Sequence, residues 1–96
     1  MCGIIGSSYL DINRMDVLGH VHRGPDANSL FKKNNISLGH TRLSIVGHDE
    51  GHQPLVSKCK RYGLVFNGEI YNFIELKNQY PGIFHSDVRS DTEVLF

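Results

Sequence analysis

The sequence has no excess of either charge, because ten Lys and Arg residues balance ten Asp and Glu residues over 96 positions. This balance favours neither a nucleic acid nor a membrane surface as a partner. No apolar run approaches the ~20 residues of a membrane-spanning helix, and no basic-then-apolar signal peptide opens the chain. We therefore expect a cytoplasmic protein that binds neither partner.

Cysteine is scarce, with only Cys2 and Cys59 in the chain. A disulfide framework is not expected without a secretory signal, which again favours a reducing compartment. Cys59 lies between two lysines in a polar stretch, and we interpret it as a bystander thiol.

The usual signatures of metal and nucleotide sites are missing as well. The histidines form no H-E-x-x-H helix and have no cysteine pair beside them, so we expect no metal. Neither a G-x-x-x-x-G-K-[ST] loop nor a G-x-G-x-x-G turn occurs, so no nucleotide-phosphate site is predicted.

The hydrophobic pattern predicts a mixed α and β protein with short strands. Strands are expected around residues 4–5, from residue 29, over 36–40 with one buried face, and over 62–66 with both faces covered. Asn34-Asn35 is expected to form a hairpin turn. Helices are expected over 11–21 with Met15 and Leu18 on the apolar side, from residue 72 to a stop at 81–82, and from residue 90 in a capping box.

Cys2, directly behind the initiator Met1, is the most informative residue. Removal of Met1 would place a thiol and a free α-amine on one residue. An unblocked α-amine titrates close to neutral pH, so it can serve as the base for its own nucleophile. A cysteine at position 2 also occurs by chance, so Cys2 alone does not decide the function.

Three further features carry possible chemistry. The Asn67 amide and the Gly68 backbone N–H follow an apolar run and suit an oxyanion hole, although a plain Asn-Gly turn is the alternative. Arg42 has apolar flanks and could grip a carboxylate, or it could be a surface arginine. Asp91 could bind an ammonium group or help to cap the last helix, and Glu69 could line a polar pocket or lie on the surface.

These features belong to a series of ordered blocks. They are M-C-G-I-I-G at 1–6, R-G-P-D at 23–26, H-x-R-L-S-I at 40–45, Q-P-L at 53–55, N-G-E-I-Y-N at 67–72 and S-D-T-E at 90–93. The series resembles the class II glutamine amidotransferases, and in particular the glutaminase domain of glutamine-hydrolysing asparagine synthetases.

The resemblance implies a fold and a reaction. The fold would be the N-terminal-nucleophile αββα four-layer sandwich, an α+β architecture. Residues 1–96 would form the N-terminal portion of the domain, with its remainder and an ATP-dependent synthetase domain outside this chain. Glutamine would be hydrolysed to glutamate and ammonia through a Cys2 thioester, and the ammonia would convert aspartate to asparagine. Alternatives are an acceptor such as a sugar acid, or a catalytically silent fragment or binding module.

The resemblance also implies roles for matching residues. Cys2, Asn67 and Gly68 would be catalytic, the last two as oxyanion donors. The glutamine-binding residues would be Arg42, Leu43, Ile45, Val46, Glu69 and Asp91. The glutaminase step would need no cofactor, whereas ATP and Mg²⁺ would belong to the synthetase domain. Expected partners are glutamine, a synthetase domain or subunit that receives ammonia, and possibly further copies of the chain.

Overall fold

The computed structural model describes residues 1–44, 52–84 and 90–96. In chain order the elements are β1 (Gly3–Ser7), α1 (Arg14–Leu18), β2 (Ala27–Lys33), β3 (Ile36–Arg42), β4 (Leu55–Val56), β5 (Gly63–Leu64), α2 (Phe73–Gln79) and α3 (Asp91–Leu95). The fold is therefore mixed α and β with antiparallel sheets, as an α+β class requires.

The larger sheet has the strand order β1-β3-β2, with both pairings antiparallel. Strands β2 and β3 form a hairpin in which Lys33 pairs with Ile36. The predicted turn at Asn34 is confirmed, and Asn34 has a φ of 53°, a left-handed conformation that asparagine tolerates. In the other pairing, Gly3 lies opposite Thr41. This register places Cys2, one residue before β1, beside the C-terminal end of β3.

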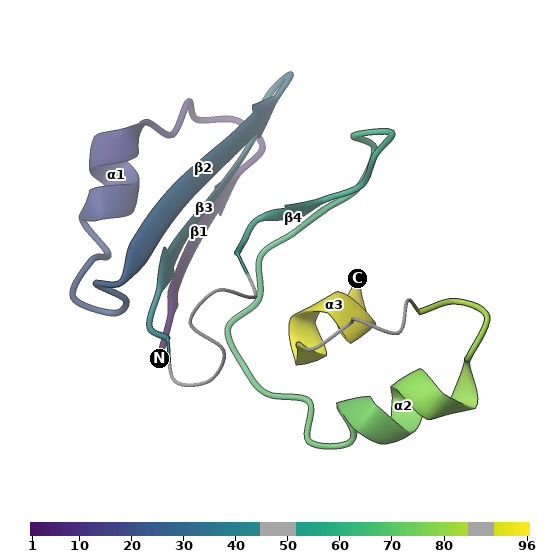
Figure 1. Ribbon diagram of the computed structural model, residues 1–96. Helices are drawn as coiled ribbons and strands as arrows, with labels where there is room; N and C mark the ends of the chain where they lie inside the picture. Colours follow the sequence, from purple (N-terminus) through teal and green to yellow (C-terminus); the bar gives the residue numbers. More distant parts are fainter. Residues whose placement is uncertain (45–51, 85–89) are drawn as a thin grey trace.

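Helix α1 covers one face of this sheet (Figure 1). The Asn13 side chain caps the helix and forms a capping box with Asp16. Val17 is only 1% exposed, and it packs so closely on β3 that a Cβ at Gly39 would lie 2.6 Å from it. The predicted helix over 11–21 is confirmed in position but is shorter. Its predicted apolar side was wrong at Met15, which is 72% exposed, because Val17 makes the contact instead.

The small β4–β5 sheet lies over the opposite face of the larger one (Figure 1). A Cβ at Gly63 would lie 3.2 Å from Leu38 of β3, which marks the close approach of the two sheets. Both faces of β3 are consequently covered, since Thr41 on the α1 side is fully buried and His40 on the other side is 2% exposed. The prediction of a single buried face for this strand was therefore wrong.

The expected strand over 62–66 is also much shorter than predicted. Only residues 63–64 pair, and their partners are the two residues of β4. Tyr62 is 62% exposed, so the prediction that both faces of this strand are covered was wrong. The apolar residues of this segment therefore do not form a long buried strand.

Helices α2 and α3 pack against each other beside the sheets (Figure 1). Helix α2 starts after Asn72 and ends before Pro81, as predicted, although the Asn72 side chain makes no capping hydrogen bond. Helix α3 starts after Ser90, whose hydroxyl accepts a hydrogen bond from Glu93 N at 3.2 Å, as the sequence predicts. Within residues 1–44, 52–84 and 90–96, the helices lack the length and apolar character of a membrane span.

Candidate functional site

The half-buried thiol of Cys2 lies against the backbone of Leu43. Leu43 N donates a hydrogen bond to Cys2 Sγ at 3.4 Å, and Sγ lies 3.8 Å from Leu43 O. Antiparallel pairing of β1 with β3 produces this contact, because both residues lie just outside the paired strands at the same end. The sulfur is thus held at the sheet edge by the first residue after β3.

The loop at residues 23–26 fixes the backbone next to this thiol. Asp26 N donates to Arg42 O at 2.9 Å, and the Asp26 carboxylate accepts from Ser44 N at 2.6 Å. Gly24 is needed for this approach, because a Cβ there would lie 2.4 Å from the Arg42 carbonyl carbon. The R-G-P-D block therefore anchors residues 42–44 beside Cys2.

Arg42 is an internal residue and not a surface arginine, since it is only 7% exposed. It ends β3 on the same face of the sheet as His40, two residues earlier. The two residues contribute to the lining of a cavity of about 300 Å³ between the larger sheet and the chain that leads into β4. A guanidinium in such a position is suited to a planar anion such as a carboxylate.

His40 is a buried neighbour of this guanidinium that sequence reasoning gave no role. Burial, and secondarily the charge of Arg42, lower the pKa of His40 from 6.5 to about 4. Its Nε2 has no hydrogen-bond partner among the described residues. The imidazole is therefore neutral at physiological pH, and Arg42 carries a positive charge beside it in the lining of this cavity.

Asp91 is joined to the segment that leads into α2. Its Oδ2 accepts a hydrogen bond from Ile70 N at 2.9 Å, and its Oδ1 accepts one from the Thr92 hydroxyl at 3.4 Å. Ser90 is the N-cap residue of α3, and Asp91 lies in the first turn, where a carboxylate is favourable for the helix N-terminus. The carboxylate is thus hydrogen-bonded to the segment that follows the candidate oxyanion residues.

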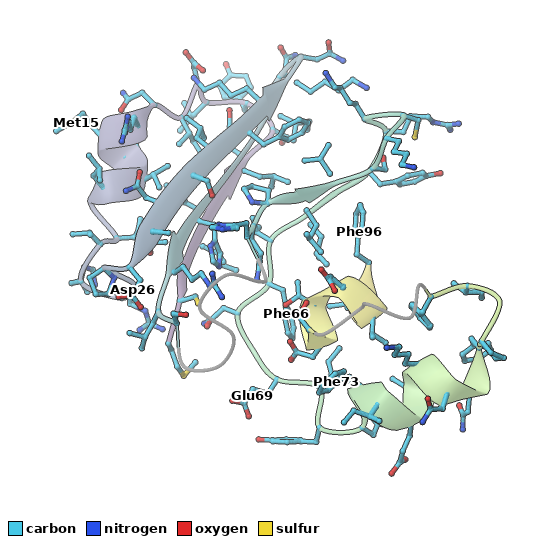
Figure 2. All side chains as sticks on the ribbon, viewed as in Figure 1. Met15, Asp26, Phe66, Glu69, Phe73 and Phe96 are labelled. Atoms are coloured by element: carbon cyan, nitrogen blue, oxygen red, sulfur yellow. The ribbon has the colours of Figure 1, made fainter. Side chains whose placement is uncertain are left out.

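Those residues, Asn67 and Gly68, lie between β5 and α2, so a hairpin turn between two strands is excluded. Asn67 is half-buried, whereas Gly68 and Glu69 are exposed. Figure 2 shows the Glu69 side chain projecting away from α2 and α3. Among the described residues, no hydrogen bond joins this tripeptide to Cys2.

The structure therefore brings the predicted site residues together in two groups. Cys2, Leu43 and Arg42 meet at the end of the larger sheet, and Asp91 meets the segment that carries the tripeptide. Ile45 and Val46, also predicted to line the site, lie outside the described residues. The individual catalytic and binding roles of all these residues stay predictions.

Gln53 is a second buried residue of this region to which sequence reasoning gave no function. It is 8% exposed, and it makes hydrogen bonds to β2, to Phe66 and to Thr92 of α3. Its place in the Q-P-L block was the only available signal, because nothing in the local pattern distinguishes it from an ordinary loop glutamine.

Cys59 differs from Cys2 in its surroundings. It is exposed, and its Sγ lies 3.3 Å from the Ser57 hydroxyl, which lowers the pKa of the Cys59 thiol. Both cysteines are free. Over the described ranges, no group of three or more His, Cys, Asp or Glu side chains is placed to hold a metal ion.

Comparison with known families decides the classification, since residues 1–96 match the model of a glutamine amidotransferase domain. The chain belongs to the glutamine amidotransferase domain family. This glutamine amidotransferase domain is similar to asparagine synthetase [glutamine-hydrolyzing] 1 of Bacillus subtilis, with 45% identity over 78 aligned positions, which cover 78% of the chain and 12% of the relative. It is also similar to asparagine synthetase B [glutamine-hydrolyzing] of Escherichia coli, with 42% identity over 74 residues, 77% of the chain and 13% of the relative.

A third relative is aligned over almost the whole chain. Asparagine synthetase [glutamine-hydrolyzing] 3 of Bacillus subtilis is 33% identical over 108 aligned positions, which cover 99% of the chain and 17% of the relative. The chain thus spans less than a fifth of the length of these relatives. The family predicted from the ordered sequence blocks is confirmed, and so is the likeness to glutamine-hydrolysing asparagine synthetases.

Proposed function

We propose that this domain hydrolyses the side-chain amide of glutamine to glutamate and ammonia, with Cys2 as an N-terminal nucleophile. The observation that carries the proposal is the position of the Cys2 thiol. The thiol lies against Leu43 N, and Leu43 directly follows the buried Arg42 in the chain. The domain itself belongs to the glutamine amidotransferase family. A thiol, a buried cation and a fixed backbone are what an amidase for a small charged substrate needs.

The reaction would begin with removal of Met1, because an amide-bonded Cys2 nitrogen cannot accept a proton. The freed α-amine would then take the thiol proton while Sγ bonds to the amide carbon. The carbonyl oxygen would become an oxyanion, stabilised by the Asn67 side-chain NH₂ and the Gly68 N–H. When the C–N bond breaks, the α-ammonium would return the proton to the leaving nitrogen, and ammonia would depart. Water would then cleave the thioester to release glutamate and restore the thiol.

Substrate recognition would rest on the two charged ends of free glutamine. Arg42 would bind the α-carboxylate in a bidentate manner, and its 7% exposure supports a strong interaction because little water competes there. Asp91 would hold the α-ammonium, with Glu69 near it. Backbone groups of Leu43, Ile45 and Val46 would line the pocket. A site that requires both charges should reject peptides and simple amides.

The proposed fold is the N-terminal-nucleophile αββα sandwich, of which this chain would supply the front part. Two layers that cover the larger sheet support this fold. Helix α1 covers one face of the larger sheet, and a second antiparallel sheet covers the other face, which gives the sequence of layers α, β, β (Figure 1). The catalytic thiol then lies just before the start of the first strand.

The ammonia would pass to an ATP-dependent synthetase domain or subunit that converts aspartate to asparagine. The names of the relatives support this acceptor over a sugar acid, since they are described as glutamine-hydrolysing asparagine synthetases. ATP and Mg²⁺ would act in that partner, and the glutaminase step would need no cofactor.

The proposal is tested by an ammonia-release assay with glutamine as substrate, with Cys59→Ala as the matched control for Cys2→Ala. Cys2→Ala should abolish glutamine hydrolysis because the nucleophile is lost. Cys59→Ala should retain the wild-type rate, since Cys59 is exposed. In a protein with a synthetase partner, Cys2→Ala should keep ammonia-dependent asparagine formation. Glutamine hydrolysis that survives in Cys2→Ala would contradict the proposal.

A further inference from the structure

Two hydrogen bonds bracket the candidate oxyanion tripeptide at residues 67–69. Immediately before it, Phe66 N donates to Gln53 Oε1 at 2.5 Å. Immediately after it, Ile70 N donates to Asp91 Oδ2 at 2.9 Å. Each flanking backbone N–H is thus held by a side chain from a distant part of the sequence.

The two holding side chains are connected through Thr92. Gln53 Nε2 donates to the Thr92 hydroxyl at 3.5 Å, and this hydroxyl donates to Asp91 Oδ1 at 3.4 Å. The donor and acceptor roles are consistent along the whole path, because a hydroxyl has one proton to give and can accept another. Since Phe66 N must donate to a carbonyl oxygen, the Gln53 amide has to present its NH₂ to Thr92.

The connecting side chains are buried and anchored to the sheet. Gln53 is 8% exposed and Thr92 is 6% exposed, so water competes little with these hydrogen bonds. The backbone carbonyl of Gln53 also accepts a hydrogen bond from the hydroxyl of Ser29 in β2. The larger sheet, the tripeptide segment and α3 therefore meet at Gln53.

We propose that Gln53 and Thr92 are positioning residues that clamp the segment 66–70 and so fix the Asn67 and Gly68 donors for the oxyanion. This inference rests on the proposed glutaminase function. Oxyanion stabilisation depends on donors that are already in place before charge develops. A clamp at both ends of this short, partly exposed segment supplies this order, and Gln53 and Thr92 contribute to it without touching the substrate.

Thr92→Val is the most direct test, because it keeps the side-chain volume and removes both hydrogen bonds of the hydroxyl. We expect kcat for glutamine hydrolysis to fall on the order of tenfold, which corresponds to the loss of about one hydrogen bond. KM should change less than kcat, since Arg42 is untouched and Asp91 keeps its hydrogen bond from Ile70 N. Thr92→Ser, which keeps the hydroxyl, should recover most of the wild-type kcat.

A double-mutant cycle with Asn67→Ala distinguishes positioning from a general loss of stability. Asn67→Ala alone should cost on the order of 10²–10³ in kcat. If Thr92 acts through this donor, adding Thr92→Val to Asn67→Ala should cost little more. Fully additive losses, or a wild-type kcat in Thr92→Val, would overturn the proposal.

Amide hydrogen exchange tests the clamp without any activity. Thr92→Val should accelerate exchange at Phe66 N and Ile70 N while leaving β3 protected, and Thr92→Ser should behave as the wild type. Unchanged exchange at both amides in Thr92→Val would overturn the clamp even in an active enzyme. Absence of glutaminase activity in the wild-type protein would contradict the proposed function instead, and the exchange result would still decide the clamp.

Discussion

Cys2 and His40 illustrate how position in the sheet determines the properties of single residues. Cys2 lies at the sheet edge, where Leu43 N contacts its sulfur and the thiol remains partly accessible. His40 lies inside, where burial and Arg42 keep its ring neutral. Both residues belong to the β1–β3 pair or directly precede it. The accessible Cys2 thiol is suited to attack a substrate, whereas the buried His40 ring is not.

The lowered pKa of His40 predicts an acid-dependent loss of stability. Below pH 6.5 an unfolded histidine takes up a proton, whereas His40 in the folded protein stays neutral down to about pH 4. The free energy of unfolding should therefore fall by about 1.4 kcal/mol per pH unit from this group as the pH drops through that window. The contribution should level off below pH 4.

Denaturant unfolding of His40→Asn between pH 7 and pH 4 measures this contribution. The slope of stability against pH should be shallower in His40→Asn than in the wild type. His22→Asn is the matched control, because His22 is exposed, and it should keep the wild-type slope. An identical slope in His40→Asn and the wild type would show that His40 titrates normally.

Sequence reasoning could predict individual site residues but not the contacts that arrange them. Cys2, Arg42 and Asp91 were singled out as candidates from their local sequence, and the resemblance to a known family implied their roles. Gln53 was missed as a positioning residue because its hydrogen bonds reach 13, 24 and 39 residues along the chain. Such contacts depend on how distant segments pack, which no local pattern encodes.

At the scale of elements, the loop at residues 23–26 and strand β3 form one structural unit. The Asp26 hydrogen bonds hold the backbone of residues 42–44, and Gly24 allows the loop to reach that backbone. Accurate placement of the residue after β3 matters because Leu43 N contacts the Cys2 sulfur. The loop thus acts on the site through the strand end.

Gly24→Ala should disrupt this unit. The new Cβ would lie 2.4–2.5 Å from backbone atoms of Thr41 and Arg42, which cannot move without distorting the sheet. We expect a loss of at least ~1–3 kcal/mol in the free energy of unfolding, as for other overpacked positions. Gly82→Ala is the control, since nothing lies within 4 Å of its Cβ position, and it should change stability by less than about 0.5 kcal/mol. Equal stability of the two variants in thermal unfolding would contradict this account.

Elements with strong local signals were the ones that the sequence predicted well. The Asn34 turn and the Ser90 cap depend on neighbouring residues, and both formed. The covering of β3 on both faces and the shortness of β5 depend on how the two sheets meet. Alternation in residues 36–40 predicted the strand but could not reveal what would lie on its second face.

At the scale of the whole molecule, most of the buried side chains in the described part of the chain are polar. The buried apolar side chains among the described residues are Ile12 and Val17. The buried polar ones are Ser37, His40, Thr41, Arg42, Gln53 and Thr92. Most of the buried polar side chains lie around the candidate site, so its hydrogen bonds also contribute to holding the sheets and α3 together.

The central step of the proposed reaction is the formation of a glutamyl thioester at Cys2. The most direct measurement is acid-quenched mass spectrometry of the N-terminal peptide during turnover of glutamine, with the peptide around Cys59 as an internal control. The account predicts a peptide that starts at Cys2, without Met1, and carries one glutamyl group on its sulfur, while the Cys59 peptide stays unmodified. A turning-over enzyme whose N-terminal peptide retains Met1, or whose glutamyl group is found on Cys59, would contradict the account.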